Sequence, residues 1–321
     1  GLADVDADRP VTPQSLLTQG SVTKTLTAAA IMKLAEAGAI DLEAPVTLYL
    51  PDFTMADERY KDITVDMLLS HRSGLPDSPA VWQEPLDPAM APLTQAVRTL
   101  EDMQLLFTPN TDWNYSSWGY SLLGAIISAV TGEPYAEYME TAWLKPLGMT
   151  ASTFDIEATA PISRTTLYKG YRIDRLRPAD PPADPRDAPA GGLWSNCDEM
   201  AKWALLMLNR GDFYGEQFLS PTSIEAMWEP LSGINWMLGP RYDPAFTGYG
   251  RGWIVGERAG HRLAGHMGAG EGVNTQLQLA PDDALVVIAI TNWHQPGASF
   301  GYPASFAAVD VLYLLLGIEP D

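Results

Sequence analysis

Cysteine is nearly absent from this chain, which has one, Cys197, in 321 residues. A single cysteine excludes a disulfide within the chain. Neither a second cysteine nor a clear base stands near Cys197 in the sequence. We therefore interpret it as a small core residue rather than as a nucleophile.

Histidine is also scarce, and the four copies are His71, His261, His266 and His294. A zinc site built from them would need distant segments to converge, and the chain has no H-E-x-x-H motif. The glycine-rich run at 268–272 lacks the Lys-Ser/Thr of a phosphate-binding loop. We predict no metal and no cofactor. The absence of a G-x-S-x-G elbow disfavours an α/β-hydrolase.

Basic residues are few, with 20 Lys and Arg against 40 Asp and Glu, a net charge of −20. Such a charge disfavours nucleic acid and anionic membranes as partners and suits a neutral or cationic ligand. Long apolar runs are missing as well, because the longest, 311–318, is far shorter than the ~20 residues that span a bilayer. Hydrophobic residues still make up 46% of the chain, enough for a sizeable core.

Apolar residues recur with two different spacings in different parts of the chain. Apolar residues at helical spacing, with Gly or Pro boundaries, predict helices. The expected helices are Ser21–Gly38, Val65–Ser70, Leu93–Leu106, Tyr120–Val130, Asp198–Asn209, Ser223–Trp228 and Phe306–Leu316. Alternating or β-branched runs predict strands. The expected strands are Tyr249–Val255, Arg262–His266, Val273–Leu279 and Ala284–Thr291.

The order of these elements predicts an α/β part joined to an all-α part. Pro281-Asp282-Asp283 is a turn that makes the last two strands an antiparallel hairpin, and the final helix would cover one face of that sheet. Residues 1–20 and 191–321 would form the part with the sheet, and residues 21–190 the mainly helical part. The proline-dense segment Arg177–Gly192 predicts a long loop without regular structure.

Ser21-Val22-Thr23-Lys24 opens the first expected helix. Residues three apart lie one turn apart on the same helix face, so the Lys24 amine comes within reach of the Ser21 hydroxyl. A serine is a weak nucleophile until a neighbouring base takes its proton. A lysine becomes that base when burial or nearby positive charge lowers its pKa. The tetrapeptide alone is common, and most copies are a helix cap with a solvated lysine.

Two further segments stand with it in a characteristic order: Trp113–Gly124, which begins Trp-Asn-Tyr115-Ser-Ser117, and Gly265-His266-Met267-Gly268. Together the three resemble the penicillin-recognising serine hydrolases, which comprise class C β-lactamases, D-alanyl-D-alanine carboxypeptidases and their esterase relatives. The resemblance runs over nearly the whole chain. Three more segments carry it, Leu68–Pro76, Leu144–Met149 and Ala190–Ser195.

The resemblance implies a role for each site residue. Ser21 is the nucleophile that forms an acyl-enzyme, Lys24 lies beside it, and Tyr115 matches the tyrosine of the Y-x-N motif that moves protons to the leaving group. Lys24 and Tyr115 titrate as one coupled pair, and the sequence leaves open which is the base. The backbone N–H groups of Ser21 and Ala269 would form the oxyanion hole, and Gly268 would let the backbone approach the substrate.

Two positions depart from the family pattern. Ser117 replaces the asparagine of Y-x-N, which binds the acyl side-chain amide, so efficient β-lactam hydrolysis is not expected. The third motif is His266-x-Gly268 instead of Lys-Thr-Gly. A histidine is mostly neutral near pH 7, which weakens the case for an anionic substrate. We expect Ser117, His266 and Gly268 to line the substrate site.

The beginning of the chain gives a third departure, because family members carry a helix and a hairpin before the segment that matches Gly1–Asp6. The first two family strands are therefore expected to be missing. That would leave a three-stranded remnant with an unpaired edge, an unusual replacement, or help from a partner chain. A truncated sequence explains this most simply, and half of an assembly is the other reading.

The sequence therefore predicts a serine hydrolase that acts through an acyl-enzyme on an amide, ester or β-lactam bond of a small molecule or peptide. A D-amino-acid peptidase or carboxylesterase is favoured over a β-lactamase. The alternative is a penicillin-binding sensor, acylated at Ser21 with slow or no turnover. The resemblance suggests a periplasmic or secreted protein, although the chain shows no signal peptide. The oligomeric state is left open.

Overall fold

The computed structural model describes residues 1–78, 85–155, 157, 164–171, 175–180, 184–234, 245–294 and 303–319. Its α-helices are α1 (Thr23–Glu36), α2 (Val46–Tyr49), α3 (Val65–Leu69), α4 (Pro92–Arg98), α5 (Ser117–Thr131), α6 (Tyr135–Met139), α7 (Ala188–Gly191), α8 (Cys197–Leu208), α9 (Pro221–Met227) and α10 (Pro303–Leu316). Other helical turns are η1 (Gly20–Val22), η2 (Glu58–Asp62), η3 (Glu140–Leu144) and η7 (Pro185–Asp187). In the described part of the chain, no helix is both long and apolar enough to cross a membrane.

The main sheet is antiparallel and six-stranded, in the order β14-β13-β12-β11-β10-β9. Its strands are β9 (Ser232–Gly233), β10 (Phe246–Tyr249), β11 (Ile254–Arg258), β12 (His261–Gly270), β13 (Val273–Ala280) and β14 (Leu285–Thr291). The remaining strands are short and form three two-stranded sheets and one three-stranded sheet, β15-β4-β5, among the described residues. They are β1 (Leu2–Asp4), β2 (Arg9–Pro10), β3 (Leu17–Thr18), β4 (Tyr168–Lys169), β5 (Arg177–Pro178), β6 (Trp194–Ser195), β7 (Asp212–Phe213), β8 (Glu216–Gln217) and β15 (Trp293–His294). The predicted β13–β14 hairpin is confirmed.

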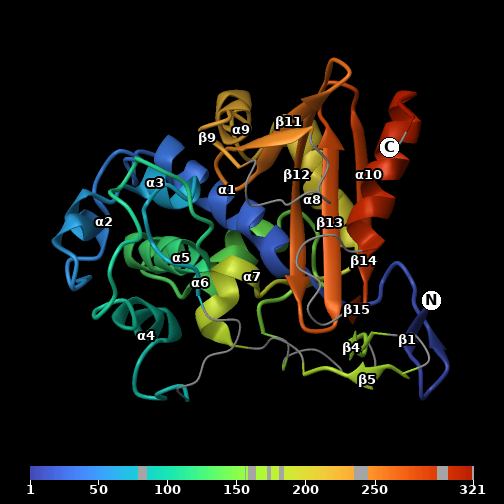
Figure 1. Cartoon of the computed structure of the whole chain (residues 1–321), viewed down its shortest axis with the longest axis horizontal. Helices are drawn as coiled ribbons and strands as arrows, with labels where there is room; N and C mark the ends of the chain where they lie inside the picture. The colour runs from blue at the N-terminus through green and yellow to red at the C-terminus, as the bar shows by residue number, and fades with distance from the viewer. Residues whose placement is uncertain are drawn as a thin grey trace.

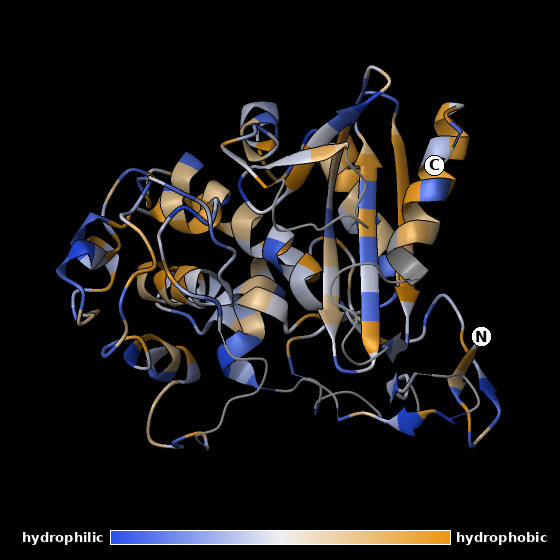
Figure 2. Cartoon of the chain, viewed as in Figure 1, coloured by the Kyte–Doolittle hydropathy of each residue, from blue (hydrophilic) through white to orange (hydrophobic). Residues whose placement is uncertain are grey.

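Both faces of the sheet are covered by helices. Successive side chains of a strand point to opposite faces, so β14 contributes apolar side chains to the packing on each face. Leu285 and Val287 of β14 pack in the apolar cluster that includes Leu312 of α10, while Val286 and Ile288 pack in the cluster that includes Trp203 of α8. Figure 1 shows α10 along one side of the sheet and the group of helices α2 to α6 on the other side of the molecule. In Figure 2 β14 and much of α5 carry the colours of apolar residues, whereas β13 alternates between hydrophilic and hydrophobic colours.

The sheet corrects two expectations. The three-stranded remnant is wrong, since six strands are paired. The single strand expected at Tyr249–Val255 is also wrong, because β10 ends at Tyr249 and β11 begins at Ile254. Between them Gly252 has φ +81°, where a Cβ would lie 2.6 Å from the Cβ of Ala28, so the chain turns there against α1.

Two helical expectations need correction as well. The helix expected at Leu93–Leu106 ends at Arg98. The residues expected to end this helix form hydrogen bonds with other segments instead. The Leu105 N–H donates to Asp57 Oδ2, and the Leu106 N–H donates to the Gly74 carbonyl. The segment Arg177–Gly192 is not without regular structure, because it holds β5, η7 and the short helix α7. Pro189 sits in the first turn of α7, where a helix has no use for its missing N–H.

The outer edge of the sheet is β14. Within the described residues it pairs only with β13, and every one of its residues is partly exposed. The expectation that two family strands are missing stays a prediction, as does the division into residues 1–20 with 191–321 and residues 21–190. What the fold does establish is the position of α1. Its N-terminus meets β12, which brings the first and third sequence motifs together.

Candidate active site

Ser21 lies in η1, the turn that leads into α1, where three neighbours hold the backbone. Gln19 donates its N–H to the Leu193 carbonyl at 2.8 Å. Gly20 has φ +50°, and a Cβ on it would lie 3.0 Å from the Ala269 nitrogen. A Cβ on Gly268 would lie 2.0 Å from the Gln19 carbonyl oxygen. Glycine at 20 and 268 therefore lets η1 and β12 touch backbone to backbone, and Ser21 is fixed at their contact.

Lys24 is fully buried one turn into the helix. Its Nζ lies 3.2 Å from Ser21 Oγ, 3.4 Å from Ser117 Oγ and 2.7 Å from the carbonyl oxygen of Ala190 in α7. Burial lowers the pKa of Lys24 to about 8, although the carboxylates of Asp77 and Asp187 oppose the shift. A substantial fraction of the amine is therefore neutral near physiological pH.

Tyr115 completes the group around Ser21. Its hydroxyl is hydrogen-bonded to Ser21, and its ring centroid lies 4.8 Å from Lys24 Nζ. Burial raises the pKa of Tyr115 well above its ordinary value, against the opposing effect of the Ser21 hydrogen bond. Tyr115 is accordingly a neutral phenol at rest, with a proton to donate.

His71 clamps the segment that carries Tyr115. The Asn114 N–H donates to the His71 carbonyl at 3.0 Å, and the Ser116 N–H donates to His71 Nδ1 at 3.1 Å. The His71 and Tyr115 rings lie 4.4 Å apart between centroids. His71 has φ +59°, a left-handed backbone that is uncommon for histidine. Burial holds its pKa well below the usual value, so the ring is neutral and Nδ1 is free to accept.

His266 of β12 is almost completely buried, at 1% exposed. Its Nδ1 lies 2.7 Å from the Met267 carbonyl and its Nε2 lies 3.0 Å from the Tyr249 hydroxyl. Since a carbonyl only accepts, Nδ1 donates and Nε2 accepts from Tyr249. Burial lowers the pKa of His266 to about 3, so it is neutral. That His266 contacts substrate stays a prediction, but both ring nitrogens already have partners.

Ser117 begins α5 and faces two charged groups. Its hydroxyl lies beside Lys24 Nζ, and its N–H donates to Asp77 Oδ1 at 2.7 Å. The Asp77 side chain is exposed, and its carboxylate contributes to the field on both Lys24 and Tyr115. The structure therefore adds a carboxylate at this end of the site.

The three predicted motifs thus meet at one place. Ser21, Lys24, Tyr115 and Ser117 come together beside Gly268, and Ala269 is exposed at the end of β12, next to Gly20. In the described residues, no three His, Cys, Asp or Glu side chains gather as they would around a metal ion.

Sequence reasoning missed four groups at this site: the Ala190 carbonyl, the Asp77 carboxylate, the His71 clamp and the Tyr249 hydroxyl. The segment Leu68–Pro76 did show a turn-rich pattern around His71. The other three had no signal of their own, because their importance comes from contacts between distant segments.

Known proteins are similar to this chain over most of its length. The profile of the family described as Beta-lactamase matches residues 1–310. A hydrolase of unguisins from Aspergillus campestris is 28% identical over 97% of this chain and 58% of its own length. Protein flp of Staphylococcus aureus is 26% identical over 91% of this chain and 56% of its own length. The chain thus spans little more than half of these curated relatives.

Solved structures share the fold. An octameric penicillin-binding protein homologue from Pyrococcus abyssi is 30% identical, with a TM-score of 0.82, over all of this chain and 70% of its own. A D-stereospecific amidohydrolase from Streptomyces is 25% identical, with a TM-score of 0.70, over 87% of this chain and 82% of its own.

Proposed function

This chain belongs to the β-lactamase family, and from that premise we propose that it is a serine hydrolase that cleaves an amide or ester through an acyl-enzyme at Ser21. The observation that carries the proposal is the contact between Ser21 Oγ and a fully buried lysine amine at 3.2 Å. A buried amine with a pKa of about 8 is a competent base for a serine hydroxyl.

The contacts of Lys24 support it, rather than Tyr115, as the resting base. A neutral amine has two N–H groups and one lone pair. The Ala190 carbonyl can only accept, and the Ser117 hydroxyl accepts the second N–H. In the neutral amine this leaves the lone pair for the Ser21 hydroxyl, whose Oγ lies 3.2 Å from Nζ. Tyr115 is less suited to this task, because burial raises its pKa and keeps its proton on.

The reaction follows from these protonation states. Lys24 takes the Ser21 proton as Oγ bonds to the substrate carbonyl carbon, and the carbonyl oxygen becomes an oxyanion facing the Ser21 and Ala269 N–H groups. The carbon–nitrogen or carbon–oxygen bond then breaks, and the leaving group takes the Tyr115 proton, which Lys24 replaces. A water molecule then attacks the ester of the acyl-enzyme by the same steps, which releases the acid and regenerates Ser21.

The charges around the site favour a substrate with a free ammonium group. Asp77 places a carboxylate beside Ser117, and His266 is neutral where a lysine would attract a substrate carboxylate. Two proteins similar to this chain, a hydrolase of unguisins and a D-stereospecific amidohydrolase, support amide cleavage. We therefore favour amides or esters of D-amino acids over β-lactams. Ser117, His266 and Gly268 are proposed to shape the acyl pocket.

A substrate panel tests the proposal: D- and L-phenylalanine amide, N-acetyl-D-phenylalanine amide, p-nitrophenyl acetate and nitrocefin. We expect turnover that is fastest with the free D-amide, and labelling of Ser21 by a fluorophosphonate. No turnover together with no labelling would contradict the hydrolase. A lasting penicillin adduct on Ser21 without turnover, seen by intact mass, would favour the binding sensor instead.

Asp77→Asn isolates the ammonium preference. Asn keeps the oxygen that accepts from the Ser117 N–H and removes only the charge. Because the variant also changes the pKa of Lys24, the two substrates are compared at one pH, and we expect the ratio of kcat/KM for the free D-amide to kcat/KM for the N-acetylated amide to fall about tenfold. An equal loss for both substrates would contradict the role given to Asp77.

A further inference from the structure

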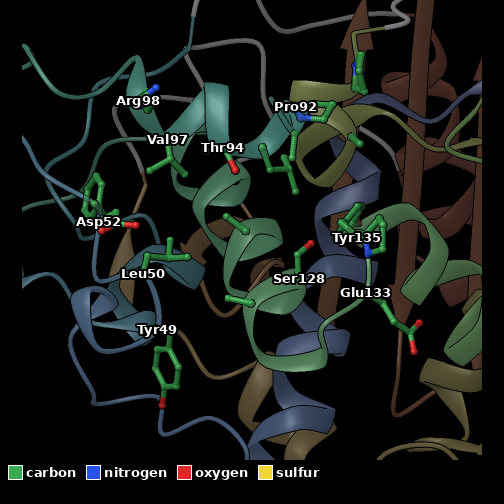
Figure 3. A pocket seen from close by; sticks show the side chains of 18 of the residues that line it. Tyr49, Leu50, Asp52, Pro92, Thr94, Val97, Arg98, Ser128, Glu133 and Tyr135 are labelled. Carbon is green, nitrogen blue, oxygen red and sulfur yellow. The ribbon is translucent and has the colours of Figure 1, made fainter. Parts of the chain in front are cut away.

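A cavity of about 930 Å³ opens between α4, α5 and α6, away from Ser21. Small-molecule sites in proteins have volumes of about 300–1,000 Å³. The cavity exists because α5 presents Ala125, Ser128, Ala129 and Gly132 there, side chains too small to fill the space. Figure 3 shows Leu50 and Val97 on one side of Ser128, and Tyr135 and Glu133 on the other.

The cavity is separate from the catalytic residues. It borders the C-terminal half of α5, whereas Ser117 lies at the first residue of the same helix. The eight residues from Ser117 to Ala125 correspond to about 12 Å along the helix axis. None of the predicted site residues lines the cavity.

The charges of the lining define the chemistry of an occupant. Three carboxylates, Asp52, Glu101 and Glu133, face one guanidinium, Arg98. Arg98 Nε lies 3.6 Å from Glu101 Oε1, so the opposite charges of this ion pair neutralise each other. Asp52 and Glu133 make no ion pair within the described residues, and they stand at opposite ends of the space in Figure 3. An apolar body with a positive charge therefore complements this cavity.

The inner wall of the cavity is connected to Lys24. The buried Tyr135 lines it, and its hydroxyl lies 2.7 Å from Thr27 Oγ1. Thr27 Oγ1 in turn donates to the Pro189 carbonyl at 2.7 Å, so Tyr135 must be the donor to Thr27. Ala188, the first residue of α7, also lines the cavity, and the Ala190 carbonyl of α7 accepts from Lys24 Nζ.

The helix α7 has little freedom to move independently of these contacts. A Cβ on Gly124 of α5 would lie 2.1 Å from Pro189 Cγ, so the two helices touch where glycine permits it. A displacement at Ala188 or Tyr135 therefore reaches the carbonyl that holds Lys24.

We propose that this cavity is a second ligand site that binds a small apolar amine and transmits its occupancy to Lys24 through Thr27 and α7. The proposal stands apart from the substrate assigned to Ser21, because binding here can be measured without turnover.

The binding test uses 4-phenylbutylamine, with 4-phenylbutanol and 4-phenylbutyrate as the neutral and anionic counterparts, in titration calorimetry at neutral pH. We expect the amine to bind at least about tenfold more tightly than either counterpart. Prior labelling of Ser21 with a fluorophosphonate should not abolish binding of the amine. Equal binding of all three, no binding, or loss of binding on labelling would overturn the proposal.

Variants locate the site. Ala129→Trp, at an exposed position of α5 on the cavity lining, should weaken amine binding at least about tenfold by filling the space. Asp52→Asn with Glu133→Gln should weaken the amine and not the alcohol. Leu48→Trp, an exposed α2 position outside the lining, should have no effect. Unchanged binding in Ala129→Trp would overturn the assignment.

A separate experiment tests whether occupancy of the cavity affects Lys24. The amine should change the rate of Ser21 labelling by the fluorophosphonate in the unaltered protein. Thr27→Val keeps the shape of the side chain and removes the hydroxyl between Tyr135 and Pro189. We expect Thr27→Val to bind the amine with similar affinity and to lose the effect on labelling. An equal effect in both proteins, or none in either, would overturn the transmission.

Discussion

At the scale of single residues, Lys24 shows how burial turns a common side chain into a base. The sequence places it one turn from Ser21, but its low pKa depends on being enclosed by segments that arrive from elsewhere in the chain. The proton balance of the site is therefore a property of the folded protein and gives a direct test.

We predict that kcat/KM for the N-acetylated amide, which does not titrate in this range, rises with pH and levels off above about pH 8, because the base is the neutral form of Lys24. Asp77→Asn should shift the rising part of the kcat/KM–pH profile to lower pH, since the Asp77 carboxylate raises the pKa of Lys24. Lys33→Met, on the same helix but away from Ser21, is the control and should leave the rising part of the kcat/KM–pH profile at the same pH. A profile that is flat between pH 6 and 9 (about a hundredfold range of neutral amine) would contradict Lys24 as the base.

His71 is the second residue with a sharp prediction. We expect His71→Ala to lower kcat by about 10- to 100-fold, because the segment around Tyr115 loses its clamp and small displacements are costly in catalysis. His71→Asn should restore much of the loss, since asparagine tolerates a positive φ and its Oδ1 can accept from the Ser116 N–H. Steady-state kinetics of the two variants decides this, and equal loss in both would refute a positioning role.

At the scale of elements, the site depends on the contact between η1 and β12. We predict that Gly268→Ala lowers the free energy of unfolding by about 3 kcal/mol, because its Cβ would lie 2.0 Å from the Gln19 carbonyl oxygen. Gly270→Ala, two residues along the strand, meets only Val273 Cγ1 at 3.5 Å and should cost less than about 1 kcal/mol. Urea unfolding measures both. Similar values for the two would show that the backbone contact is not tight.

The sequence anticipated one long helix well at this scale. The helix expected at Tyr120–Val130 is confirmed by α5, which ends at Gly132 in the left-handed conformation. The boundary between β10 and β11 was missed, because residues 249–255 contain enough apolar side chains for one strand. What breaks the strand is the packing of Gly252 on Ala28, more than 200 residues away in the chain.

At the scale of the whole molecule, one ion-pair group joins the helices to the sheet. Asp66 of α3 is 4% exposed and lies 2.5 Å from an Arg72 nitrogen and 2.6 Å from Arg251 Nε, in the turn between β10 and β11. Two guanidinium groups thus share one buried carboxylate, and each comes from a different part of the fold.

We predict that Asp66→Ala lowers the free energy of unfolding by about 3–5 kcal/mol, because it leaves both arginines without the carboxylate that neutralises them. Glu58→Gln, which breaks the exposed pair with Lys61, should cost less than about 1 kcal/mol. Chemical denaturation of the two variants gives the comparison. A small effect at Asp66 would mean that the two parts are held together by apolar packing alone.

The sequence by itself determined the family and predicted the residues of the site. The order of Ser21-x-x-Lys24, Tyr115 and His266-x-Gly268 is local information, because each motif is readable within a few residues. The family membership is confirmed, whereas the roles of these residues stay predictions. Helix and strand periods also depend on near neighbours, and for this reason the long helices and the long strands were anticipated, whereas short elements such as α2, α6 and α7 were not.

Only the tertiary structure decided the charge state of Lys24, the clamp on Tyr115, the carboxylate of Asp77 and the cavity beside α5. Each arises where segments distant in the chain meet. Burial, the field of a neighbouring carboxylate and unfilled volume depend on distances across the fold, and no local pattern of residues records those distances.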